Sequence, residues 1–82
     1  MKWNLAKDNI RPDKVTYQDR YARCLVKIGE FNTCILWYDK DKDYWCNEAV
    51  SDEWEFQLEP AIPFERIIGW CYLQDVITML DE

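Results

Sequence analysis

The stretch that decides the fold is "YARCLVKIGEFNTCILWYDKDKDYWCNE", residues 21–48. Its first eight residues alternate between an apolar and a mixed side, which is the period of two that predicts a strand. "GEFN" at 29–32 then predicts a turn, and "TCILWYD" at 33–39 is a continuous β-branched and aromatic run without helix caps. Residues 33–39 therefore predict a central strand buried on much of both faces, and residues 21–48 predict a three-stranded antiparallel meander.

The turn "DKDKD" at 39–43 carries three alternate aspartates and raises the question of a calcium loop. An EF-hand loop that begins at Asp39 needs Gly at its sixth position and Glu at its twelfth, where this chain has Tyr44 and Val50. The flanking segments are typical of strands, and two interleaved lysines neutralise part of the acidic charge. We therefore interpret this stretch as a solvated hairpin turn and predict no metal site there.

Beyond the meander the period of two returns in "SDEWEFQLE", residues 51–59, with aromatic and aliphatic residues on one face and acidic residues on the other. Pro60 and Pro63 are expected to break the chain, and "RIIGWCYL" at 66–73 predicts a last strand. The remainder, 74–82, predicts a short helix or tail.

Together these segments predict a mostly β or α+β fold. The expected architecture is a small antiparallel meander sheet of four to five strands with at most one short C-terminal helix. A chain of 82 residues is one domain, 1–82, because a core of this size cannot be divided. Within it we expect an N-terminal arm and turn (1–20), a β-rich core (21–73) and the helix or tail (74–82). Five Trp, five Tyr and three Phe supply enough apolar area for so small a core.

The composition makes a catalytic or metal site hard to build. The chain has no His, and therefore neither an ordinary catalytic triad nor a general base near neutral pH. The four cysteines lie ten, twelve and twenty-five positions apart without a C-x-x-C knuckle, which is not a zinc spacing. No Gly-rich phosphate loop is present. We predict a protein that is not an enzyme, with no catalytic residues, metals or cofactors.

Location and cysteine chemistry follow from the same features. No stretch approaches the roughly 18 to 20 apolar residues of a membrane span, and "MKWNLAKDNIRP" lacks the apolar core of an export signal. We expect a cytoplasmic protein without membrane association, whose thiols are reduced and mostly buried. Cys34 and Cys46 would face each other if their hairpin paired positions whose numbers sum to 80, and the sequence leaves that register open.

Charge is unevenly distributed along the chain. Residues 1–27 carry seven basic against three acidic side chains, a balance of +4, and residues 28–82 carry three against thirteen, a balance of −10, which gives the net −6. Phosphate contacts need clustered Lys and Arg, so direct nucleic-acid binding is disfavoured. An acidic face that meets a basic partner fits this distribution better.

The acidic strand at 51–59 is the predicted partner-binding segment, with candidate residues Asp52, Glu53, Glu55 and Glu59. The simpler interpretation is a half-buried strand whose outer face is only solvated. The expected partner is a protein, of a basic or nucleic-acid-handling kind. One alternative is a homodimer formed through an exposed strand edge, and another is an acidic inhibitor that mimics the charge of nucleic acid.

The run that starts at "W" and continues through "CLVKI", "ILWYD", "YW" and "IIGWCYL" resembles a short phage and prophage family called domain of unknown function 551. The resemblance spans most of residues 3–73, and the matching positions are Trp3, Pro12, Leu25, Val26, Trp45 and Trp70. The chain departs from the family by a longer stretch between Pro12 and Leu25 and by "WCYLQD" in place of a Pro-flanked ending. The resemblance implies an accessory protein of a phage or integrated element, acting in the host cytoplasm by binding a protein. It also implies that the matching tryptophans mark the core.

Overall fold

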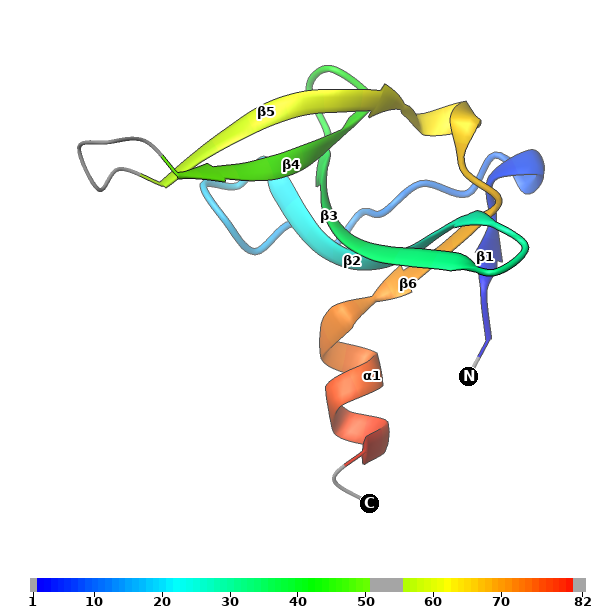
Figure 1. Ribbon diagram of the computed structural model, residues 1–82. Coiled ribbons are helices and arrows are strands. Elements are labelled where there is room, and N and C mark those ends of the chain that lie inside the picture. The colour runs from blue at the N-terminus through cyan, green and yellow to red at the C-terminus, as the bar shows by residue number, and fades with distance from the viewer. Residues whose placement is uncertain (1, 51–55, 81–82) are drawn as a thin grey trace.

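The computed structural model describes residues 2–50 and 56–80 (Figure 1). Within them the chain forms one antiparallel sheet with strand order β1-β6-β2-β3-β4-β5, followed by a helix. The elements are β1 (Asn4–Leu5), η1 (Ala6–Asp8), β2 (Tyr21–Gly29), β3 (Asn32–Asp39), β4 (Tyr44–Val50), β5 (Phe56–Pro63), η2 (Phe64–Arg66), β6 (Gly69–Tyr72) and α1 (Leu73–Leu80). The predicted class, a small antiparallel sheet with one short C-terminal helix, is confirmed. The described part has six strands because the N-terminal arm adds β1.

The predicted meander is present as β2, β3 and β4. A two-residue turn joins β2 to β3, and the two strands pair from Tyr21 opposite Asp39 to Gly29 opposite Asn32, with a bulge at Ile28 where the register shifts by one residue. Their buried face carries the alternate residues Ala22, Cys24, Val26, Leu36 and Tyr38. The opposite face is only partly covered, since Ile35 is 45% exposed, so the expected burial of 33–39 on both faces is wrong. The reason is that α1 and the segment around Tyr17, whose ring centroid lies 5.6 Å from that of Trp37, cover the outer face of the described sheet only in part.

The hairpin of β4 and β5 projects away from the rest of the sheet (Figure 1). β4 pairs with β3 at three positions only, Trp37–Asp39 against Tyr44–Cys46, and then diverges. It pairs with β5 as far as Val50 opposite Phe56. β5 runs through Pro60 to Pro63, so the predicted break at these prolines is wrong. Proline lacks an N–H and is tolerated at a sheet edge or bulge; β5 is the last strand of the sheet, and a register shift lies opposite Pro60.

The N-terminal arm is attached to β6. Asn4 and Leu5 pair with Trp70 and Gly69, and the N–H of Ala6 donates to the carbonyl oxygen of Ile68 at 3.0 Å. A Cβ on Gly69 would lie 3.3 Å from both Asn4 O and Trp3 Cβ. This glycine therefore permits the close approach of β1.

Aromatic rings fill the core beneath the curved sheet. Trp45 and Phe64 are fully buried with ring centroids 6.0 Å apart, and Tyr38 packs edge-on against both. Trp70 is 2% exposed, and its indole N–H donates to the carbonyl oxygen of Ile10 at 2.8 Å. Trp45 and Trp70 are thus core residues, as expected, whereas Trp3, the third tryptophan expected to mark the core, is only half-buried.

The helix α1 begins at Leu73, directly at the end of β6, and leads away from the sheet (Figure 1). Its apolar residues recur at helical spacing, at Leu73, Val76, Ile77 and Leu80, yet none of its residues is buried. Ile77 is 43% exposed and Leu80 is 80% exposed. An apolar stripe of this kind is typical of a helix face that packs against another protein surface.

Candidate functional site

The acidic turn between β3 and β4 is built around its own aspartates. Asp39 is buried and accepts two hydrogen bonds of 2.8 Å from the guanidinium of Arg20. It also accepts the backbone N–H groups of Asp41 and Lys42 at 3.0 and 3.3 Å. Asp43 adopts a left-handed conformation with φ of 57°, which Asp tolerates in turns.

The carboxylates of this turn are held by cations of the chain itself. Asp43 forms an ion pair of 2.8 Å with Arg11 and accepts the hydroxyl of Tyr38. Burial alone would raise the pKa of Asp39, but the hydrogen bonds from Arg20 and the two backbone N–H groups hold it below its ordinary value. The hydrogen bond from Arg11 does the same to the pKa of Asp43. Across residues 2–50 and 56–80, no group of three or more possible metal ligands comes together.

The cysteines sit in the sheet as free thiols, and three of the four are buried: Cys24, Cys46 and Cys71. Cys46 lies opposite Trp37, and Cys34 lies opposite Val26, so Cys34 and Cys46 do not face each other. The β3–β4 register sums to 83, which rules out the register of 80. Burial raises the pKa of each thiol, which keeps the nucleophilic thiolate scarce.

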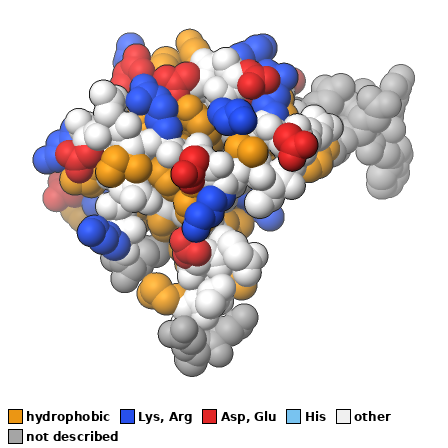
Figure 2. All heavy atoms as spheres, turned by 180° about the vertical axis from the view of Figure 1, so that it is seen from behind, with side chains coloured by type: hydrophobic (Ala, Val, Ile, Leu, Met, Phe, Trp, Pro, Cys, Tyr) orange, Lys and Arg blue, Asp and Glu red, His pale blue; other side chains and the backbone are white. Residues whose placement is uncertain are grey.

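Of the predicted partner-binding residues, Glu59 lies on β5 and is exposed, opposite Asn47 of β4. Asp52, Glu53 and Glu55 lie outside the described residues. Glu48 is also exposed, but it lies opposite Leu58, the neighbour of Glu59, so the two carboxylates point to opposite faces of the hairpin. On the back of the molecule, Figure 2 shows Lys and Arg interspersed with Asp and Glu, with apolar side chains between them.

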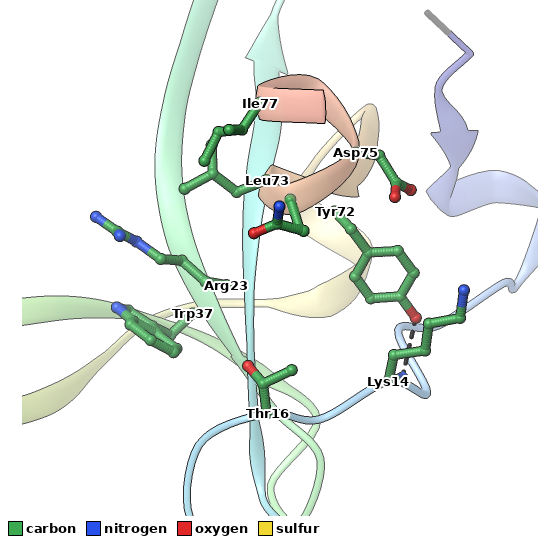
Figure 3. Close-up of a pocket in the computed structure, with 9 residues that line it drawn as sticks. Lys14, Thr16, Arg23, Trp37, Tyr72, Leu73, Asp75 and Ile77 are labelled. Carbon is green, nitrogen blue, oxygen red and sulfur yellow. Dashed lines mark hydrogen bonds between the residues drawn. The ribbon is translucent and has the colours of Figure 1, made fainter. Parts of the chain in front are cut away.

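A cavity that the sequence did not indicate lies where α1 meets the outer side of the sheet (Figure 3). We call it the α1 groove. Its volume is about 520 Å³, within the range of ligand sites. It is lined by Lys14, Thr16, Arg23, Trp37, Tyr72, Leu73, Gln74, Asp75 and Ile77. Four segments distant in the sequence thus contribute to one site.

The two aromatic rings of the α1 groove have their polar atoms engaged within the protein. The Tyr72 hydroxyl accepts the backbone N–H groups of Asp13 and Lys14, at 2.8 and 3.0 Å, and donates to the Asp13 carboxylate at 2.8 Å. Burial raises the pKa of Tyr72, so the hydroxyl remains a donor across the physiological range. The Trp37 indole N–H donates to Glu48 at 2.8 Å. Trp37 also packs against Tyr17, with ring centroids 5.6 Å apart, and Tyr72 against Trp70, with ring centroids 5.0 Å apart, so each ring offers a ligand only the carbon surface that lines the cavity.

Each ring of the α1 groove has a cation beside it. The Lys14 ammonium lies 5.5 Å from the centre of the Tyr72 ring, and the Arg23 guanidinium lies 5.7 Å from that of Trp37. Such distances are within the range of cation–π contacts. Arg23 also approaches Glu48 at 3.5 Å, with both side chains nearly half exposed. The groove thus combines aromatic faces, two accessible cations and the apolar side of α1.

A second cavity, of about 540 Å³, opens where β4 diverges from β3, and Arg23, Ile35, Asn47 and Glu48 line it. Arg23 lines both cavities, so the two adjoin. In antiparallel pairs, alternate residues direct their backbone groups to opposite neighbours. Trp37 and Asp39 pair with β4, so the backbone N–H and C=O groups of Thr33 and Ile35 point to the same edge of β3. No described strand pairs with β3 at these two residues.

Comparison with known proteins does not assign a family: scans of family models, curated proteins and solved structures each found no match. No described helix has the length and apolar character to cross a membrane.

Sequence reasoning missed the α1 groove. The two-residue turn at 30–31 by itself would place Arg23 opposite Tyr38, and only the bulge at Ile28, where the register shifts by one residue, places it opposite Trp37. Lys14 and Tyr72 come together only because the N-terminal arm crosses to the end of β6. No local pattern signals that crossing.

Proposed function

We propose that this chain is a non-enzymatic interaction module that docks on another protein through the acidic β4–β5 hairpin. The observation that carries the proposal is the projection of this hairpin, which pairs with β3 at only three positions before it diverges (Figure 1). A projecting hairpin offers both faces and an edge to a partner. It is therefore a better docking element than any strand inside the sheet.

Charge supports a basic partner for this hairpin. Glu59 is exposed on its described part, Glu48 is exposed but bonds to Trp37 and Arg23, and the sequence between Val50 and Phe56 adds three carboxylates around Trp54. Charge of one sign steers a partner of the opposite sign and fixes its orientation. The proposed partner is a basic or nucleic-acid-handling protein, and the proposed setting is the cytoplasm of a phage host, as the family resemblance implies.

The cysteines support a binding role and not a catalytic one. They are the strongest nucleophiles in a chain without His, and burial raises the pKa of every one of them. A thiol of this kind is largely protonated at neutral pH and unreactive.

The test is affinity capture from a bacterial lysate at 0.05 and 0.5 M salt, with the double variant Glu55→Lys/Glu59→Lys as the probe. The matched control is Asp8→Lys/Glu30→Lys, which changes the charge equally at exposed sites away from the hairpin. We expect the unchanged protein and the control to retain one basic partner that high salt releases. Retention of that partner by the hairpin variant would refute the proposal.

Self-association is a second candidate function, favoured by the side of β3 that no described strand covers between Asn32 and Leu36. Phe31, in the adjoining turn, is 91% exposed. Edges of this kind pair with other chains. A dimer held in this way would persist in 0.5 M salt, whereas acidic docking, including mimicry of nucleic acid, would weaken.

A further inference from the structure

The α1 groove has chemistry opposite to that of the β4–β5 hairpin. The chain carries a net charge of −6, yet the lining of this groove contains two cations and a single carboxylate, Asp75. Lys14 has no ion pair among the described residues. The ion pair of Arg23 with Glu48 is long, at 3.5 Å, and is exposed to solvent. Both cations are available to an anionic ligand.

Apolar surface accompanies these cations. Trp37 and Tyr72 face the cavity from opposite sides, and Leu73 and Ile77 of α1 lie between them at its upper end (Figure 3). The polar atoms of both rings are already bonded within the protein. The rings therefore select for apolar or aromatic surface, and the cations select for negative charge.

The shape of the site favours a chain molecule over a compact one. The groove adjoins the second cavity at Arg23, and the two together lead from α1 to the uncovered side of β3. Backbone groups of Thr33 and Ile35 point toward that side and suit an extended peptide. A small ligand would fill one cavity and leave the other open.

We propose that the α1 groove is a second binding site, which takes an acidic peptide segment of a partner protein that carries one aromatic side chain. The aromatic side chain lies between Trp37 and Tyr72 against Leu73 and Ile77. Carboxylates on either side of it meet Lys14 and Arg23. This goes beyond the docking of the hairpin on a basic partner, because the charge, the elements and the partner are different. With both sites the chain joins two proteins.

The test uses the acetylated and amidated peptide Asp-Glu-Phe-Glu, with Lys-Lys-Phe-Lys and Asp-Glu-Ala-Glu as controls, titrated into the whole protein by calorimetry and by amide NMR. We expect the acidic aromatic peptide to bind about tenfold more tightly than either control, since loss of a buried ring or of paired charges is worth roughly 1.4 kcal/mol or more. The shifted amides should belong to Lys14, Arg23, Trp37 and α1. This comparison needs no variant and is insensitive to folding defects.

Charge reversal then locates the site. Lys14→Glu and Arg23→Glu should each weaken binding about fivefold, as expected for exposed pairs changed from attraction to repulsion. Lys40→Glu, an equal charge change in the β3–β4 turn, is the control and should change binding less than about twofold. Circular dichroism verifies that each variant is folded.

Several outcomes would overturn the proposal. Equal binding of acidic and basic peptides would refute the role of the cations, and an equal effect of Lys40→Glu would place the site elsewhere. Self-association of the unchanged protein that Lys14→Glu abolishes would make a second copy, with its own "DEWE" at 52–55, the occupant in place of a partner. Lysate capture through the hairpin should be unchanged in Lys14→Glu, since the ion pair with Glu48 of the hairpin belongs to Arg23, so the two proposals fail separately.

Discussion

Removal of a single oxygen atom, by Tyr72→Phe, tests how the N-terminal arm is held and how the α1 groove is formed. The Tyr72 hydroxyl bonds to the N–H groups of Asp13 and Lys14 and to the Asp13 carboxylate, and these contacts join the arm to β6. The substitution leaves the ring in place, so its packing against Trp70 is retained, with ring centroids 5.0 Å apart. Any change in stability therefore comes from the hydrogen bonds.

The expected magnitude follows from the exposure of the partners. Asp13 and Lys14 are exposed, so water replaces the lost acceptor, and each bond is then worth about 0.5 kcal/mol, the low end of its usual range. Three such bonds give a loss of about 1.5 kcal/mol in the free energy of unfolding. For a domain of this size that lowers Tm by roughly 6–12 °C.

Urea unfolding followed by tryptophan fluorescence measures the loss, and hydrogen exchange of the Asp13 and Lys14 amides locates it. Tyr44→Phe is the matched control, because the hydroxyl of the exposed Tyr44 has no partner among the described residues. We expect Tyr44→Phe to be neutral, and Tyr72→Phe to lose amide protection at both positions and to bind the acidic peptide more weakly. Equal stability of the two variants, with protection retained at Asp13 and Lys14, would refute the attachment described above.

The remaining predictions concern pH and the two glycines. Asp39 and Asp43 have folded-state pKa values below their ordinary value of 3.8, so they add stability that is present above that pH and is lost as the pH falls through the folded values. The thiols of Cys24 and Cys71 have raised pKa values, so stability should also fall as the pH rises above their ordinary value of 9.0. Urea midpoints between pH 2 and 11 should therefore trace a plateau with two flanks, and an acid flank unchanged in Asp39→Asn, with Glu30→Gln as control, would contradict the assignment. Gly69→Ala should destabilise by about 1–3 kcal/mol, because its Cβ would press on Asn4 O and Trp3 Cβ. Gly29→Ala, whose Cβ would meet only the Asn32 side chain at 3.6 Å, should be within about 1 kcal/mol of neutral, and the same thermal midpoint for both variants would rule out the close approach of β1.

The strands of the meander were predictable because their signal is local. Alternation along residues 21–28 and the dense β-branched and aromatic run at 33–39 are properties of neighbouring residues, and the turns between them have typical compositions. Pro60 misled the prediction because a proline reports only the missing N–H. A strand needs that N–H only where a neighbouring strand would accept it. β5 is the last strand of the sheet, so a proline is tolerated on its outer edge.

Of the two candidate sites, one was predictable from local sequence and the other was not. The acidic character of 51–59 is a matter of composition and was evident from the sequence. The α1 groove was not, since the N-terminal arm brings Lys14 to Tyr72 across 58 positions of the chain. Even Arg23 opposite Trp37 depends on the bulge at Ile28, which shifts the register of the hairpin by one residue.

The sequence by itself determined a small, acidic, aromatic-rich domain with an antiparallel meander, because alternation and composition are read residue by residue. Only the tertiary structure decided that β6 inserts between β1 and β2, that β4 leaves β3 after three pairs, and that α1 exposes its apolar side beside two cations. The physical reason is that each of these features depends on contacts between distant segments. Such contacts are selected by the packing of the whole chain and not by the preference of any one stretch.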